Sequence, residues 1–184
     1  MKLNKGTLLA CLFGVVLAAS AAPLKTDPAK SAVAAVFKQM NVPVEAKFRK
    51  FSAQIDYDAA KPELASARVE IDTASLDVGD PDMNKEVAKK EWFNSAQFPK
   101  ATFVSSSIKP AGAGKLLVNG TLSIKGRATD VSFPLALGTE AGKQVFEGAL
   151  PIKRLTYNIG EGEWKDTSMV ADEVVIKFRV AAGQ

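Results

Sequence analysis

SARVEIDTASLD, the stretch from Ser66 to Asp77, opens with a regular alternation of small or apolar residues and charged ones. The apolar positions are Ala67, Val69 and Ile71. The charged positions are Arg68, Glu70 and Asp72. Because successive side chains of a β-strand point to opposite faces, this spacing predicts a strand with one face on an apolar interior and the other in water.

The same alternation recurs along most of the chain. Clear cases run over Phe51–Tyr57, Leu116–Ile124, Val131–Leu137 and Val174–Val180, with weaker ones over Ser31–Phe37, Ala101–Ile108 and Val145–Ile152. Short stretches containing glycine or proline separate these runs and are typical of turns. The sequence therefore predicts a single all-β domain of about eight antiparallel strands. Alternation alone leaves open whether they form a sandwich or an up-and-down barrel.

One segment interrupts the alternation and predicts a short helix. Asp80 suits the N-cap, and Pro81 suits the first helical position. Apolar residues then recur at a spacing of four, as expected for one side of a helix: Met83 with Val87, and Ala88 with Trp92. The helix leads into KKEWFNSAQFPKATF (Lys89–Phe103), a junction rich in aromatic residues.

Histidine is absent from the whole chain, and Cys11 is its single cysteine. These counts exclude catalysis by Ser-His-Asp or Cys-His systems and the usual zinc, haem and copper ligand sets. A pair of carboxylates could still act as acid and base. The acidic residues, however, fall at turns or on the polar side of strands, so we expect no enzyme, no catalytic cofactor and no metal site.

A near match to a calcium loop occurs at the predicted helix. Asp80, Asp82, Asn84 and Glu91 follow the ligand spacing, but Lys85 stands where the loop needs glycine for its sharp turn. The helix itself accounts for these residues.

The first 21 residues have the layout of a secretory signal peptide. Lys2 and Lys5 precede an apolar run from Leu8 to Ala19, and small residues follow. The run is short for a membrane span of roughly 20 residues. We therefore expect cleavage before Ala22, localisation in the periplasm of a mature chain 22–184, and no stable membrane span after processing.

The mature chain would be nearly neutral. Of 24 basic residues, removal of Lys2 and Lys5 leaves 22, against 20 acidic ones, a net charge of +2. These charges are interspersed along the sequence and form no basic stripe, so nucleic acid is not expected as a partner. The sequence leaves open whether the protein is a monomer or a homodimer.

Several motifs, in order, resemble the YceI-like family of bacterial periplasmic polyisoprenoid-binding proteins. They are VEAKFRKFSAQIDYD, ARVEIDTASLD, EWFNSAQFPKATFVSSSI, VNGTLSIKGRATDVSFPLAL, RLTYNIG and VADEVVIKFRV. The resemblance implies a lipocalin-like, eight-stranded antiparallel β-barrel over residues 22–184, with an elongated apolar cavity. It also implies an isoprenoid lipid as ligand, such as a ubiquinone-type molecule or a polyprenyl compound. Many relatives carry histidine where this chain has Lys30 and Gln39, so no head-group role is carried over from those positions.

A barrel of about eight strands is wide enough to hold one small ligand. The residues that we predict to line its cavity are the larger side chains on the apolar strand faces and one at the aromatic junction. They are Phe37, Phe51, Ile55, Val69, Ile71, Phe93, Phe103, Leu122, Ile124, Phe133, Phe146 and Phe178.

The expected function is that of a periplasmic carrier that sequesters an isoprenoid lipid. Two alternatives stay open at this point. One is a structural or stress-protective protein whose barrel interior is a filled core. The other is a carboxylate-based enzyme, which would need two carboxylates facing the cavity.

Overall fold

The computed structural model describes residues 23–183, so the predicted signal peptide lies outside the described residues. Its strands are β1 (Lys25–Thr26), β2 (Ala32–Gln39), β3 (Val42–Phe48), β4 (Phe51–Asp56), β5 (Ser66–Asp72), β6 (Leu76–Asp77), β7 (Lys100–Pro110), β8 (Lys115–Ile124), β9 (Arg127–Glu140), β10 (Lys143–Lys153) and β11 (Val170–Gly183). The α-helix is α1 (Pro81–Val87), and the short 3-10 helices are η1 (Pro28–Lys30), η2 (Pro62–Leu64), η3 (Thr73–Ser75), η4 (Arg154–Tyr157) and η5 (Gly162–Lys165). Within residues 23–183, no helix has the length and hydropathy needed to cross a bilayer.

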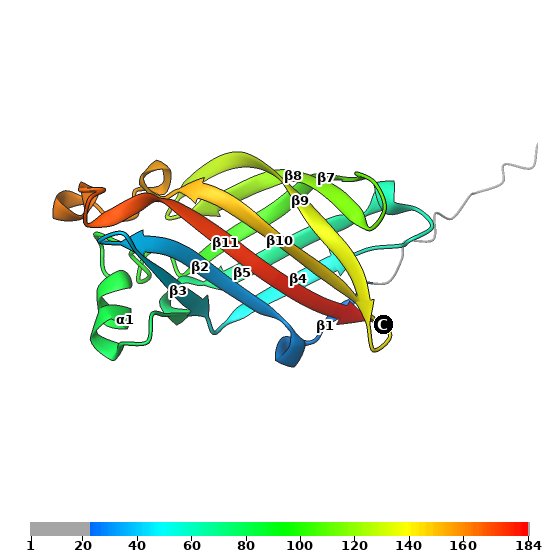
Figure 1. Cartoon of the computed structure of the whole chain (residues 1–184), viewed down its shortest axis with the longest axis horizontal. Helices are drawn as coiled ribbons and strands as arrows, with labels where there is room; N and C mark the ends of the chain where they lie inside the picture. Colours follow the sequence, from blue (N-terminus) through cyan, green and yellow to red (C-terminus); the bar gives the residue numbers. More distant parts are fainter. Residues whose placement is uncertain (1–22, 184) are drawn as a thin grey trace, which may run out of the picture.

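The strands form one curled antiparallel sheet in the order β4-β5-β7-β8-β9-β10-β11-β2-β3-β6 (Figure 1). The two ends of this order meet through the chain itself, because β3 continues into β4 across Arg49 and Lys50. The ladder also continues across this bend, since the Arg49 N–H donates to Ser75 O and the Asp72 N–H donates to Lys50 O, both at 3.0 Å. The β3–β4 and β5–β6 segments therefore act as two long bent strands.

Counted in this way, the sheet has eight long strands around a common interior, with β1 as an additional short piece. The predicted antiparallel, barrel-like all-β fold with one short helix is confirmed. The number eight is approximate, because the two bends divide the long strands into ten and β1 is an eleventh.

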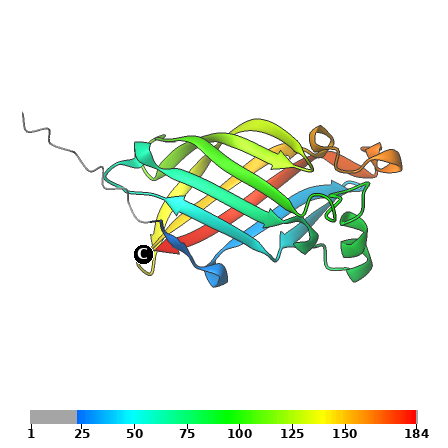
Figure 2. The same ribbon diagram turned by 180° about the vertical axis from the view of Figure 1, so that it is seen from behind.

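The N-terminal segment covers the seam where β4 diverges from β2. Lys25 and Thr26 pair with Gly183 and Ala182 of β11 on one side. On the other side Leu24 forms a bridge with Ile55, and the Thr26 hydroxyl donates to Ala53 O at 2.8 Å. Figure 2 shows this segment (blue) between the end of β11 (red) and β4 (cyan).

Two expectations from the sequence need correction. Strand β3 was missing from the predicted set, because its alternation runs without a turn signal into that of β4. The helix is also shorter than predicted, since it ends at Val87 and the chain continues in turns. In these turns Phe93 N–H donates to Val87 O and Asn94 N–H to Lys89 O, so Trp92 lies beyond the helix.

The start of α1 is fixed by two aspartates. Asp80 caps the helix by accepting from the N–H groups of Asp82 and Met83. Asp77 accepts from the Asn84 side chain at 3.1 Å and the Gly79 N–H at 2.9 Å, and it pairs with Arg49. These donors, the Asn84 amide first, lower the pKa of the Asp77 carboxyl from 3.8 to about 2.

Inside the barrel, three phenylalanines from different strands form a row. The ring centroids of Phe103 and Phe133 are 5.5 Å apart, and those of Phe133 and Phe178 are 5.6 Å apart. Glycines leave room for the outer two rings. A Cβ added at Gly120 would lie 2.6 Å from the Phe103 ring, and one added at Gly148 would lie 2.6 Å from the Phe178 ring.

The acid dependence of stability should reflect Asp77. Since its pKa is lower in the folded chain than in the unfolded one, its ionised form stabilises the fold above pH 4, and this contribution is lost as the pH falls toward 2. We expect Asp77→Asn to melt below the wild type at pH 6, with the difference shrinking between pH 4 and pH 2. Thermal melts by circular dichroism across this range measure it. A gap in melting temperature that is constant with pH would contradict the assignment.

Gly148→Ala should destabilise the barrel by overpacking. The added methyl group must displace the Phe178 ring, which typically costs about 1–3 kcal/mol, or ~2–4 °C in melting temperature per kcal/mol for a chain of this size. Gly138→Ala is the matched control on β9, because nothing lies within 4 Å of its added Cβ. Differential scanning calorimetry should show a lower melting temperature for Gly148→Ala only, and equal effects would contradict the packing role.

Candidate functional site

The barrel interior contains a chamber with an apolar wall, which we call the inner chamber. Its cavity volume is about 110 Å³, and the single hydroxyl-bearing side chain in its lining is that of Tyr57. Tyr57 packs edge-on against Phe146, with ring centroids 5.6 Å apart. Eight of the predicted lining residues border this chamber: Ile55, Val69, Ile71, Phe103, Leu122, Phe133, Phe146 and Phe178.

A second chamber, which we call the outer chamber, lies at the α1 end of the barrel and has a cavity volume of about 280 Å³. Its walls come mainly from β2, β3, β8, α1, the aromatic junction, the 154–170 segment and β11, with single residues from β5, β6, β7 and β10. Three further predicted residues border it alone: Phe37, Phe93 and Ile124. Ile71, Leu122 and Ile176 border both chambers, so the two chambers adjoin at these three residues, which we call the constriction.

Several inward-facing side chains are only half-buried even though they pack against the core. Val69, Phe103 and Phe178 are examples from three different strands. In a filled core such residues are fully buried and closely packed. Their remaining accessible surface faces the chambers, so the interior of this barrel is not completely filled.

Phe51 is the exception among the predicted lining residues. It is half-buried, and it borders a separate surface cavity with Leu24, Thr26 and Pro28, at the seam covered by the N-terminal segment. Phe51 packs against the hydrophobic core but borders neither the inner nor the outer chamber.

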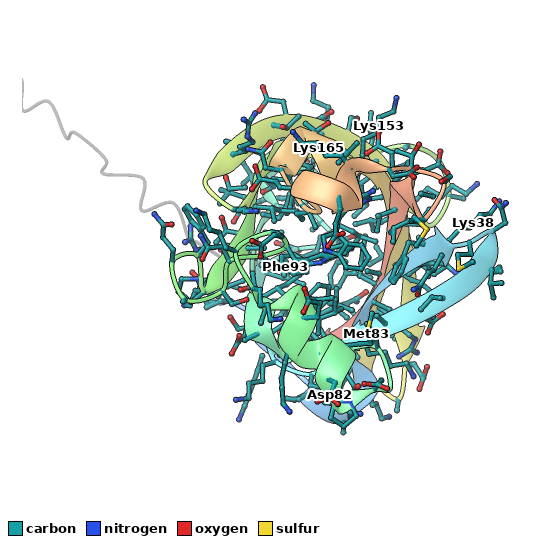
Figure 3. The ribbon with its side chains drawn as sticks, turned by 90° about the vertical axis from the view of Figure 1, so that its left-hand side faces the viewer. Lys38, Asp82, Met83, Phe93, Lys153 and Lys165 are labelled. Carbon is teal, nitrogen blue, oxygen red and sulfur yellow. The ribbon has the colours of Figure 1, made fainter. Side chains whose placement is uncertain are left out.

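The outer chamber is bounded by α1 and by the η4–η5 segment. Figure 3, an end view of the barrel, shows Phe93 between the helix and this segment, whereas Lys38, Lys153 and Lys165 point outward at the periphery. Phe93 is buried and meets Phe48 edge-on, with ring centroids 6.2 Å apart. Phe93 therefore packs against the barrel and lines the chamber at the same time.

Arg154 holds the η4–η5 segment against the barrel. Its buried guanidinium donates to the backbone oxygens of Ile159 (2.8 Å), Trp164 (2.7 Å), Val170 (2.7 Å) and Ala171 (3.1 Å). Burial lowers the pKa of this guanidinium, and Asp172 opposes the shift. Because its donors are engaged by carbonyls, Arg154 organises the chamber wall and offers little to a ligand.

The remaining charges on this wall are also engaged. Asp80 caps α1, and Glu86 pairs with Lys89. Lys125, behind the aromatic junction, donates to Lys90 O and Asn158 O at 2.7 Å and pairs with Glu161 at 2.9 Å. The lining of the outer chamber therefore presents two carboxylates and no uncommitted cation among the described residues.

Trp92 carries the one fully buried side-chain polar atom in residues 23–183 that has no hydrogen-bond partner. It is 9% exposed and borders the outer chamber, and its ring centroid lies 5.2 Å from that of Trp164. The indole N–H is buried and has no acceptor among the described residues. A buried donor without a partner costs about 1–3 kcal/mol.

Tyr57 and Trp164 border the two chambers but were not among the residues that the sequence predicted to line the cavity. Tyr57 is the last apolar position of the alternation that predicted β4, so this pattern already placed it on the same face as Ile55. The roles of Arg154 and Trp164 depend on a loop of irregular structure, for which no periodic signal exists.

Gly160→Ala should loosen the wall that Arg154 holds. Gly160 has φ +83°, and a Cβ there would overlap the Arg154 guanidinium. Gly162→Ala is the matched control, because its φ of +63° imposes similar backbone strain while no atom lies within 4 Å of the added Cβ. We expect both variants to lose about 1 kcal/mol or more through strain, and Gly160→Ala to lose a further ~2 kcal/mol through displaced hydrogen bonds. Urea denaturation measures both, and equal losses would contradict the role of Arg154.

Comparison with known proteins agrees with this geometry. The YceI-like domain family matches residues 24–182. A UPF0312 protein of Shewanella sp. (strain W3-18-1) is 35% identical over 144 residues, which is 74% of this chain and 73% of that protein. Another UPF0312 protein, from Shewanella baltica (strain OS155), is 33% identical over the same shares of the two chains.

Solved structures show the same fold. The crystal structure of Burkholderia cenocepacia BcnA is 54% identical, covers 86% of this chain and 99% of its own, and superposes with a TM-score of 0.83. A polyisoprenoid binding domain from Saccharophagus degradans has a TM-score of 0.68 at 18% identity, covering 88% of this chain and 97% of its own. The resemblance noted from the ordered motifs is confirmed, and the chain belongs to the YceI-like family.

Proposed function

We propose that this protein binds an isoprenoid lipid within the inner and outer chambers. The observation that carries the proposal is the pair of adjoining apolar chambers inside the barrel, which share Ile71, Leu122 and Ile176. The outer chamber, at about 280 Å³, is close to the lower end of the ~300–1,000 Å³ range of ligand pockets. Membership of the YceI-like family and the fold shared with a polyisoprenoid binding domain support the ligand class.

An elongated hydrocarbon suits this interior for a physical reason. Apolar surface in water costs roughly 25 cal/mol per Å², so a long prenyl chain is strongly favoured in a dry tube. The three residues of the constriction are aliphatic, so they place no polar group in the path of the prenyl chain. A chain that threads from the outer to the inner chamber would meet apolar side chains along the way.

We further propose that the protein acts as a periplasmic carrier after removal of residues 1–21. The predicted leader supports export, and a ubiquinone-type or polyprenyl lipid would need such a carrier in an aqueous compartment. The carboxylate-enzyme alternative lacks support in the chambers, because the two carboxylates of the lining are committed to helix capping and to Lys89.

Native mass spectrometry of the protein purified from its own cells tests the proposal directly. We expect a stoichiometric adduct that solvent extraction releases as an isoprenoid lipid. The mass of the polypeptide chain in the same spectrum would show whether cleavage occurs before Ala22. A protein that is empty, and stays empty after incubation with prenylquinones and polyprenols, would support the structural or stress-protective alternative.

Filling the constriction should shorten the ligand that the protein accepts. Ile176→Phe replaces a branched aliphatic side chain by a larger aromatic ring between the chambers. Overpacking of this kind typically costs ~1–3 kcal/mol, and each 1.4 kcal/mol corresponds to a tenfold change in affinity. We expect about tenfold weaker binding of a quinone with eight isoprene units and a smaller change for one with two units, measured by titration with native mass spectrometry. Val174→Phe, which narrows the outer chamber alone, should weaken both ligands. Equal losses for both chain lengths in Ile176→Phe would contradict threading through the constriction.

A further inference from the structure

The indole N–H of Trp92 is a buried hydrogen-bond donor without an acceptor, and its ring borders the outer chamber. Trp92 borders the outer chamber, and its Nε1 is the buried side-chain nitrogen left without a hydrogen-bond partner in residues 23–183. Solvent does not satisfy it either, because the atom has less than 1 Å² of accessible area. Buried polar groups in folded proteins nearly always have a partner, so the missing acceptor calls for an explanation.

The surrounding packing leaves few sources for that acceptor. One face of the indole meets Trp164, and the Arg154 guanidinium carbon lies 5.8 Å from its ring centroid. The guanidinium offers donors only, and the Trp164 backbone oxygen accepts from Arg154 at 2.7 Å but not from Nε1. A ligand in the adjoining outer chamber would bring an oxygen close to this donor.

The charges of the outer chamber restrict which oxygen this can be. Its lining holds two carboxylates, Asp80 and Glu86, and one cation, Arg154, whose donors are engaged by backbone oxygens. A phosphate or diphosphate there would lie near like charges without a free cation in the lining to pair with, which is unfavourable. A carbonyl, ether or hydroxyl oxygen carries no such cost.

We propose that Trp92 Nε1–H donates a hydrogen bond to a neutral oxygen on the isoprenoid's head group, which lies in the outer chamber while the tail extends into the inner chamber. The inference rests on the proposed lipid binding and adds two things to it. It orients the ligand with its head toward α1, and it favours prenylquinone-type heads over prenyl phosphates. The indole must shift slightly on binding to admit the acceptor, because nothing reaches Nε1 in the packing described.

Indole NMR signals test this in the intact mature protein. The sequence has two tryptophans, so two indole ¹H–¹⁵N signals are expected, and Trp164→Phe assigns them. Three probes share a tail of three isoprene units: a ubiquinone bearing it, farnesene, which lacks oxygen, and farnesyl diphosphate. We expect the ubiquinone to move the Trp92 indole proton downfield and farnesene to leave it without such a shift. A ubiquinone that binds without a downfield shift overturns the proposal.

Affinities give an independent readout. Trp92→Phe keeps an aromatic ring but removes the donor, so it should weaken the ubiquinone about tenfold and leave farnesene unchanged, as measured by native mass spectrometry. Farnesyl diphosphate should bind the wild type at least tenfold more weakly than the ubiquinone. Equal weakening of ubiquinone and farnesene, or diphosphate binding as tight as that of the ubiquinone, overturns the proposal. If the wild type binds none of the three probes, lipid binding itself fails and this inference falls with it.

Discussion

The continuity of the backbone ladder through the bend at Arg49 and Lys50 is the constraint on which the rest of the structure depends. Two hydrogen bonds, from the Arg49 N–H to Ser75 O and from the Asp72 N–H to Lys50 O, keep the sheet paired where its strands change direction. Because β3 and β4 belong to different ends of the strand order, this bend curls the sheet around an interior. Because the backbone N–H and C=O groups of the barrel wall bond to one another, they need no polar partners in the interior.

Unfilled space in the interior lowers the stability of the fold because packing contacts are missing there, so other parts of the fold must compensate. Here the rigid parts of the molecule surround the space. The row of Phe103, Phe133 and Phe178 is seated against glycines of neighbouring strands, and the carbonyls around Arg154 fix the loop at the α1 end. The aromatic row therefore lines the inner chamber, and the hydrogen-bonded loop bounds the outer one.

Much of the fold could be predicted from sequence because alternation reports the inward face of each strand directly. The runs around Phe133 and Phe178 predicted both their strands and their place on the interior. Alternation does not report where a strand bends, which is why β3 was not separated from β4. The constriction, the carbonyl cage of Arg154 and the unpaired Trp92 N–H depend on contacts between distant segments, and no local pattern encodes them.

The pairing of β1 with β11 joins Lys25 to Gly183, almost the full length of the described chain. β11 also pairs with β10 and β2, so three earlier strands, with β1 as the third, pair with the last strand of the chain. Contacts of such long sequence separation are slow to form, because the intervening chain must first be ordered. A chain of this topology cannot complete its sheet while its C-terminal part is still being synthesised. It would therefore stay largely unfolded, and able to pass through a narrow channel, until the whole chain is available.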